Sequence, residues 1–250
     1  MSLLPIVLAS VGLSDLISGG LSGRPRTFCR AVLGSLLGSL LIPLSRLGAG
    51  DAFGTGLVLY GVSAALSMAW NLFRLRGFCR GRAGLLKAAL GALSVYILSA
   101  AILSPCLRDS TIEPTWAGTL AERAALPLAP AVLGMAVSCM IVLLGTANGI
   151  VRCVLDIASP GLSKPTDNLR GGRYIGAIER VLILMLIAGG QHLAAAIVVS
   201  AKGLLRFPEL TKTEENIAEM TEYLLLGSLA SWVLAGLAGI LVIAAGGGGI

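Results

Sequence analysis

The stretch Tyr223-Leu-Leu-Leu-Gly-Ser-Leu-Ala-Ser-Trp-Val-Leu-Ala-Gly-Leu-Ala-Gly-Ile-Leu-Val-Ile-Ala-Ala245 contains 23 residues without a single charge. A helix that spans a membrane needs about 20 mostly apolar residues to cross about 30 Å of hydrocarbon, so this stretch is long enough. It does not alternate between apolar and polar positions, as a transmembrane β-strand does. It therefore predicts an α-helix that crosses a membrane.

The rest of the chain has the same apolar character. Of its 250 residues, 56% are hydrophobic and only 13% are charged, which is too little charge to cover the surface of a soluble domain. Backbone groups in lipid need internal hydrogen-bond partners, and long helices provide them. Six further apolar segments cover residues 3–21, 31–44, 53–72, 85–106, 125–151 and 175–201. The sequence predicts an all-α, polytopic transmembrane helix bundle of about seven spans, which forms one integral membrane domain over residues 1–250.

Positive charge is distributed unevenly among the gaps between the apolar segments. Of the 19 Lys and Arg residues, 13 lie in or beside the first, third and fifth gaps and 6 lie in the others. Cytoplasmic loops carry the excess of Lys and Arg, so seven spans put the N-terminus outside and the C-terminus in the cytoplasm. The net charge of +6 fits arginines that face the anionic headgroups of the lipid bilayer. Nucleic acid is not an expected partner, because no soluble basic segment is present to bind it.

The N-terminal half contains a short internal repeat. Arg24-Pro-Arg26-Thr-Phe28-Cys29-Arg30 recurs as Arg74-Leu-Arg76-Gly-Phe78-Cys79-Arg80, with five of seven positions identical. We therefore predict that residues 5–44 and 55–94 form repeated helical hairpins whose basic tips point the same way. The arginines of the two tips either contact anionic headgroups or serve only as topology anchors. They are Arg24, Arg26, Arg30, Arg74, Arg76 and Arg80.

A polar stripe is predicted in the sixth apolar segment. Arg180, Gln191 and Lys202 are each 11 residues apart, and a continuous helix over 175–206 would place all three on one face. Because a polar side chain toward lipid is costly, that face should point into the bundle, as part of a solute path or as a packing seam. A hairpin broken at Gly189-Gly190 is the alternative; the continuous span is preferred because each half would be too short to cross. The candidate residues are Glu179, Arg180, Gln191, His192, Lys202, Arg206 and Glu222.

The C-terminal quarter also carries a recurring pattern of residues. The pattern comprises Gly172, Arg173, Ile175, Gly176, Glu179, Arg180, Gly190, Gln191, Lys202, Arg206, Phe207, Glu222, Tyr223, Gly227, Ser228 and Ser231. Residues 171–235 thereby resemble the C-terminal part of a family of uncharacterised bacterial integral membrane proteins, often actinobacterial. The resemblance implies a helix pair in the bacterial cytoplasmic (inner) membrane, and it implies no particular activity.

Motifs for catalysis and metal binding are absent from the sequence. It has one histidine, five dispersed cysteines without a CxxC pair, and no Walker, HExxH or GxSxG motif, so we expect no metal and no cofactor. An intramembrane enzyme is the least favoured function, because Asp15 is the only acid well inside an apolar segment. A small-solute or ion transporter or channel is the alternative. The favoured function is a non-catalytic structural or assembly subunit that binds a second copy or another membrane protein, since the sequence shows no clear pair of broken helices.

Overall fold

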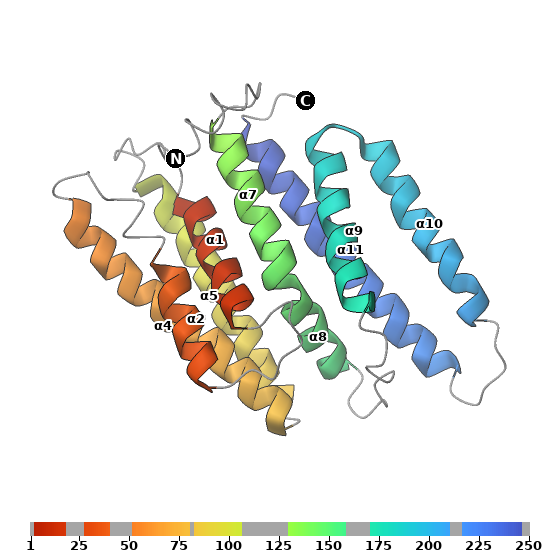
Figure 1. Cartoon of the computed structure of the whole chain (residues 1–250), viewed down its shortest axis with the longest axis horizontal. Helices are drawn as coiled ribbons and strands as arrows, with labels where there is room; N and C mark the ends of the chain where they lie inside the picture. Colours follow the sequence, from red (N-terminus) through yellow and green to blue (C-terminus); the bar gives the residue numbers. More distant parts are fainter. Residues whose placement is uncertain are drawn as a thin grey trace.

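Every element of the described chain is an α-helix, which confirms the predicted all-α class (Figure 1). The computed structural model describes residues 3–18, 28–40, 52–80, 83–106, 130–158, 171–210 and 217–246. The helices are α1 (Leu3–Ile17), α2 (Phe28–Ser39), α4 (Ala52–Arg80), α5 (Ala83–Cys106), α7 (Pro130–Gly145), α8 (Ala147–Ala158), α9 (Gly171–Ala188), α10 (His192–Leu210) and α11 (Ile217–Ala245).

The helices lie roughly along one direction and form an elongated bundle, with α4 at one end and α10 at the other (Figure 1). α1 is central, because it packs against α2 on one side and α7 on the other. α4 pairs with α5, and α11 packs against α9, α7 and α8. α10 borders mainly α9 and leaves much of its surface uncovered.

Small residues allow α1 and α2 to approach closely. A Cβ atom on Gly34 would lie 2.6 Å from the carbonyl oxygen of Ser14, and one on Gly38 would lie 2.6 Å from that of Ser10. These are backbone atoms that cannot move aside without shifting α1. The spacing of Gly34 and Gly38 therefore serves helix packing within the chain.

Many large apolar side chains lie outside the bundle, and many small and polar ones lie inside it. On α11 the exposed face carries Leu225, Leu229, Val233, Leu237 and Ile240. The buried face of the same helix carries Ser228, Ser231, Ala235, Ala238 and Val242. Two apolar clusters complete the interior, one around Trp70 and Tyr96 and the other around Leu143 and Leu184.

Within the described residues, one helix is long and apolar enough to cross a membrane, Glu222–Ala245. Ala131–Gly145 and Ala147–Ala158 meet the same criterion as a pair, with a 45° bend between them. Shorter apolar helices run over Leu4–Ile17, Ala83–Leu98 and His192–Leu204. The fold prediction is thus confirmed for its all-α class, and the structure identifies one or two candidate spans instead of seven.

The prediction of one continuous helix over residues 175–206 is wrong. α9 ends at Ala188 and α10 begins at His192, and the two helices pack against each other. Gly190 makes the turn with a φ of 74°, a left-handed conformation that glycine adopts without steric cost. Figure 1 shows the two helices as an antiparallel pair.

The two segments of the predicted repeat each contain an antiparallel helix pair, α1 with α2 and α4 with α5 (Figure 1). The end of α1 and the start of α2 lie at the same edge of the bundle as the end of α4 and the start of α5. The matching residues occupy different positions in the two pairs. Phe28, Cys29 and Arg30 begin α2, whereas the second copy forms the last turns of α4. The repeat of 5–44 and 55–94 as superposable hairpins stays a prediction.

Candidate functional site

A polar face runs along each of three helices in the N-terminal half. α1 carries Ser10 and Ser14 and is followed directly by Ser18, α2 carries Ser35 and Ser39, and α4 carries Ser63, Ser67, Asn71 and Arg74. The spacings of three or four residues keep each set on one side of its helix. All nine side chains are buried, so the three polar faces meet inside the bundle.

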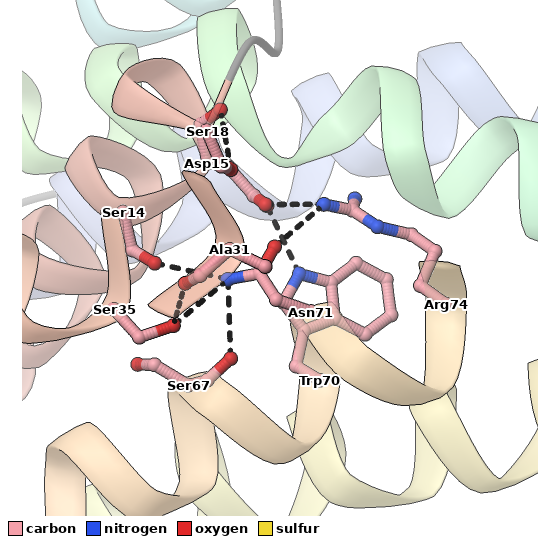
Figure 2. A network of polar contacts seen from close by, with 9 residues as sticks. All are labelled: Ser14, Asp15, Ser18, Ala31, Ser35, Ser67, Trp70, Asn71 and Arg74. Atoms are coloured by element: carbon pink, nitrogen blue, oxygen red, sulfur yellow. Dashed lines mark hydrogen bonds and ion pairs between the residues drawn. The ribbon is translucent and has the colours of Figure 1, made fainter. Parts of the chain in front are cut away.

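Asp15 and Arg74 form an ion pair at one end of this polar interior (Figure 2). Their side chains are 0% and 1% exposed. The indole N–H of Trp70 donates to the second oxygen of Asp15 at 3.0 Å, and the Arg74 guanidinium lies 4.3 Å from the centre of the Trp70 ring. The carboxylate is therefore held by two donors and the guanidinium by an acid and an aromatic face.

Asn71 links this ion pair to the three serine faces (Figure 2). Its Oδ1 accepts from Arg74 Nη2 at 3.1 Å. Its Nδ2 donates to Ser14 Oγ at 3.0 Å, to Ser35 Oγ at 3.2 Å and to the Ser67 carbonyl at 3.1 Å. One amide thus connects α1, α2 and α4 and fixes their relative rotation.

A second group of hydrogen bonds surrounds the hydroxyl of Tyr96, which enters from α5. This hydroxyl bonds to Ser10 Oγ at 2.7 Å and to Ser63 Oγ. Ser63 in turn donates to Ser39 Oγ at 3.1 Å. The polar interior therefore extends along α4 from Arg74 to Ser63, about 16 Å at 1.5 Å per residue.

Arg180 on α9 is a second buried arginine, and its surroundings differ from those of Arg74. It is 3% exposed. Its Nε–H donates to the Leu143 carbonyl at 3.3 Å, Nη1 donates to Ser231 Oγ at 3.1 Å, and Nη2 donates to Asn148 Oδ1. All three acceptors are neutral, so within the described chain no carboxylate forms an ion pair with Arg180.

The bend between α7 and α8 brings the two arginine sites together. Leu143 lies in the last turn of α7, where carbonyl groups lack helical partners, and Arg180 supplies a donor to it. Asn148 and Gly149 are consecutive residues in the first turn of α8. Asn148 bonds to Arg180, while Gly149 lies against Arg74 so closely that a Cβ atom would overlap Nη1. The first turn of α8 is thus enclosed by a guanidinium from α4 and another from α9.

The predicted polar stripe does not exist as a single face. Arg180 faces protein as expected, but Gln191 and His192 lie exposed at the turn between α9 and α10. Lys202 forms an ion pair with Glu179 across the hairpin. Glu222 is exposed at the start of the apolar part of α11.

The predicted headgroup arginines also separate into different groups. The prediction that Arg74 contacts lipid headgroups is wrong, because its side chain is buried in the ion pair with Asp15. Arg76 is exposed, and Arg30 is half-buried with a polar interaction of its own. The predictions for Arg24 and Arg26 lie outside the described residues, as do those for the side chains of Arg80 and Arg206.

Sequence reasoning missed Asn71, Asn148 and the serine faces. The signal was present as polar residues four positions apart inside apolar segments, for example Ser10-x-x-x-Ser14-x-x-x-Ser18. The pairing of Asp15 with Arg74 carries no local signal, because the two residues are 59 positions apart.

Comparison with family models, with curated proteins and with solved structures finds no match for this chain.

Proposed function

We propose that the chain is a polytopic membrane protein that moves a small solute or ion through the polar interior at the bend between α7 and α8. Support for a membrane location comes from the distribution of side chains. Leucine, valine and isoleucine cover the outside of α11, while the interior holds serine, asparagine and paired charges beside its apolar clusters. A soluble protein rarely combines a large exposed apolar face with so many buried polar side chains.

The observation that carries the transport function is the bent helix between two buried arginines. Transporters commonly build their sites from helices that are interrupted within the membrane, where freed backbone groups and ionisable side chains face the solute. The 45° bend, Arg74 and Arg180 reproduce these parts in one place. The lack of a pair of broken helices was one reason to favour a structural subunit, and the bend between α7 and α8 supplies one such helix.

Flux through reconstituted vesicles tests this proposal. The purified chain is placed in lipid vesicles, and stopped-flow swelling and a potential-sensitive dye report entry of anions, cations and neutral solutes. We expect at least one class to enter faster than in protein-free vesicles, and Arg180→Gln to change that rate while Arg76→Gln does not. If no solute class enters faster than in empty vesicles, the transport function is wrong.

A structural or assembly role is the second candidate, and α10 favours it. Leu193, Ile197 and Leu204 lie on one face of α10 and are 77%, 60% and 74% exposed. α10 borders mainly α9 and touches α11 little, so this face is free to pack against a helix of another membrane protein. A photoreactive residue at position 197 should then give one discrete protein adduct in cells. Adducts with lipid alone would exclude this role for α10.

A further inference from the structure

We propose that the first turn of α8, between Arg74 and Arg180, binds a small anion: a halide or the carboxylate group of an organic solute. The inference names the solute class for the proposed transport function and rests on that function for its physiological role. Binding itself is a separate property of the site and is tested separately below.

The charges of the buried interior do not balance. The buried charged side chains of the described chain are Asp15, Arg74 and Arg180. Asp15 neutralises Arg74, which leaves Arg180 with three neutral acceptors. Its sequence neighbour Glu179 is already paired with Lys202. A buried cation without a counter-charge is costly in a low-dielectric interior, so the site favours an anion over a cation or a neutral solute.

Donors without acceptors surround the same turn. Arg180 holds Oδ1 of Asn148, which leaves the amide Nδ2 as the free end, and Nδ2 has no partner in the described chain. The hydroxyl of Thr146, whose residue is 1% exposed, also has no partner there. On the other side of the turn, Nε and Nη1 of Arg74 are buried donors without an acceptor among the described residues. These donors require an acceptor, and an anion offers several lone pairs at once.

The helix geometry adds to this positive field. α8 has 12 residues, and its N-terminus lies at the bend. The N–H groups of a first helical turn have no helical acceptors and carry a partial positive charge, which attracts anions. Residues 146–149 are thus bordered by a guanidinium group on each of two sides, and they supply two neutral donors and a helix N-terminus. Among the described residues the buried carboxylate is that of Asp15, and it is already occupied by Arg74 and Trp70, so a cation would gain no further acid there.

Thermal unfolding of the purified full-length chain in detergent tests binding without any need for transport. Chloride or formate replaces a bulky sulfonate, which carries no carboxylate, at constant ionic strength, and the unfolding temperature is recorded against anion concentration. A ligand that binds only the folded state raises this temperature. We expect a saturable rise with chloride or formate. A response to formate but not chloride would assign the site to carboxylates, and the reverse would assign it to halides. No response to either anion would overturn the proposal.

Two substitutions separate a specific site from general salt effects. Arg180→Gln removes the unbalanced charge, so we expect it to fold and to need about tenfold or more anion for half of the effect. Asn148→Asp places a permanent carboxylate against Arg180, so we expect an unfolding temperature that no longer depends on the anion. Arg76→Gln, on the exposed side of α4, should keep the wild-type response. An unchanged response in both Arg180→Gln and Asn148→Asp would overturn the site.

The binding measurement and the flux measurement can each contradict one proposal without contradicting the other. Flux of some solute without an anion-dependent unfolding temperature would overturn the anion site and leave the transport function standing. Anion binding without flux would support the site and contradict transport.

Discussion

The side chain of Arg74 connects three helices, α1, α4 and α8. It meets Asp15 from α1, the Trp70 ring and Asn71 from its own helix, and Gly149 from α8. Removing one partner of a buried ion pair leaves a charge without compensation, which costs more than the pair itself contributes. The pair therefore specifies how α1, α4 and α8 fit together more than it adds to net stability.

This asymmetry predicts the stability of single and double variants. Asp15→Asn should lower the free energy of unfolding by about 3–5 kcal/mol, because Arg74 remains buried without its counter-charge. The double variant Asp15→Leu with Arg74→Met should recover much of the loss. Arg76→Gln, exposed on the same helix, should change stability by less than about 0.5 kcal/mol. Chemical unfolding in mixed detergent measures all three, and a double variant as unstable as Asp15→Asn would contradict this account.

Gly149 provides a second residue-scale prediction. A Cβ atom at this position would overlap Arg74 Nη1, and Arg74 cannot easily move because Asp15 and Asn71 hold its other nitrogen. Gly149→Ala should therefore destabilise the chain by about 1–3 kcal/mol, the usual cost of overpacking. Gly176→Ala is a matched control beside the other arginine, because its Cβ would lie 3.7 Å from Arg180 Nη1, an ordinary contact. Equal thermal stability of the two variants would show that Arg74 does not depend on the glycine.

At the scale of elements, the lengths of the apolar segments predicted where most of the helices lie. Contacts between residues far apart in the sequence determine where the chain turns or bends between helices. The 11-residue spacing of Arg180, Gln191 and Lys202 is equally compatible with a hairpin centred between Gly190 and Gln191, in which Glu179 meets Lys202. Whether the segment forms a continuous helix or a hairpin depends on contacts across the turn, and the spacing of residues within one segment gives no information about those contacts. The α7–α8 bend was missed for a similar reason, because the apolar segment 125–151 runs through it without a charged residue.

Cross-linking distinguishes the hairpin from a continuous helix. In a background without the native cysteines, cysteines at Glu179 and Lys202 should react together with a short bifunctional thiol reagent, since these side chains form an ion pair. A continuous helix would separate the two positions by about 35 Å. Cysteines at Glu179 and Ala188 are the negative control, because they lie about 14 Å apart along α9 in either arrangement. Failure of the first pair to cross-link in folded protein would restore the continuous helix.

At the scale of the whole molecule, the hairpin changes the predicted orientation of the C-terminus. With α7 and α8 taken as one passage, the described helices run back and forth so that α11 ends at the edge where α1 begins (Figure 1). The C-terminal ends of α1, α4, α8 and α10 and the N-terminal ends of α2, α5, α9 and α11 lie at the other edge (Figure 1). Of the 17 Lys and Arg residues other than buried Arg74 and Arg180, 14 lie in or near the stretches of sequence between these helix ends. The remaining three are Arg46, Arg108 and Arg123.

This distribution predicts that both ends of the chain face away from the cytoplasm, because the basic edge of a membrane protein is cytoplasmic. The cytoplasmic C-terminus expected from seven spans depended on the continuous helix over 175–206 and changes side with the hairpin. A reporter enzyme that is active only outside the cytoplasm should therefore be active when fused after Ile250. The same reporter fused after Leu210, between α10 and α11, should be inactive, and a reporter that fluoresces only in the cytoplasm should give the opposite pattern at both sites. Cytoplasmic fluorescence from the fusion after Ile250 would contradict passage of both α9 and α10 through the membrane, and with it the place of the anion site inside the bundle.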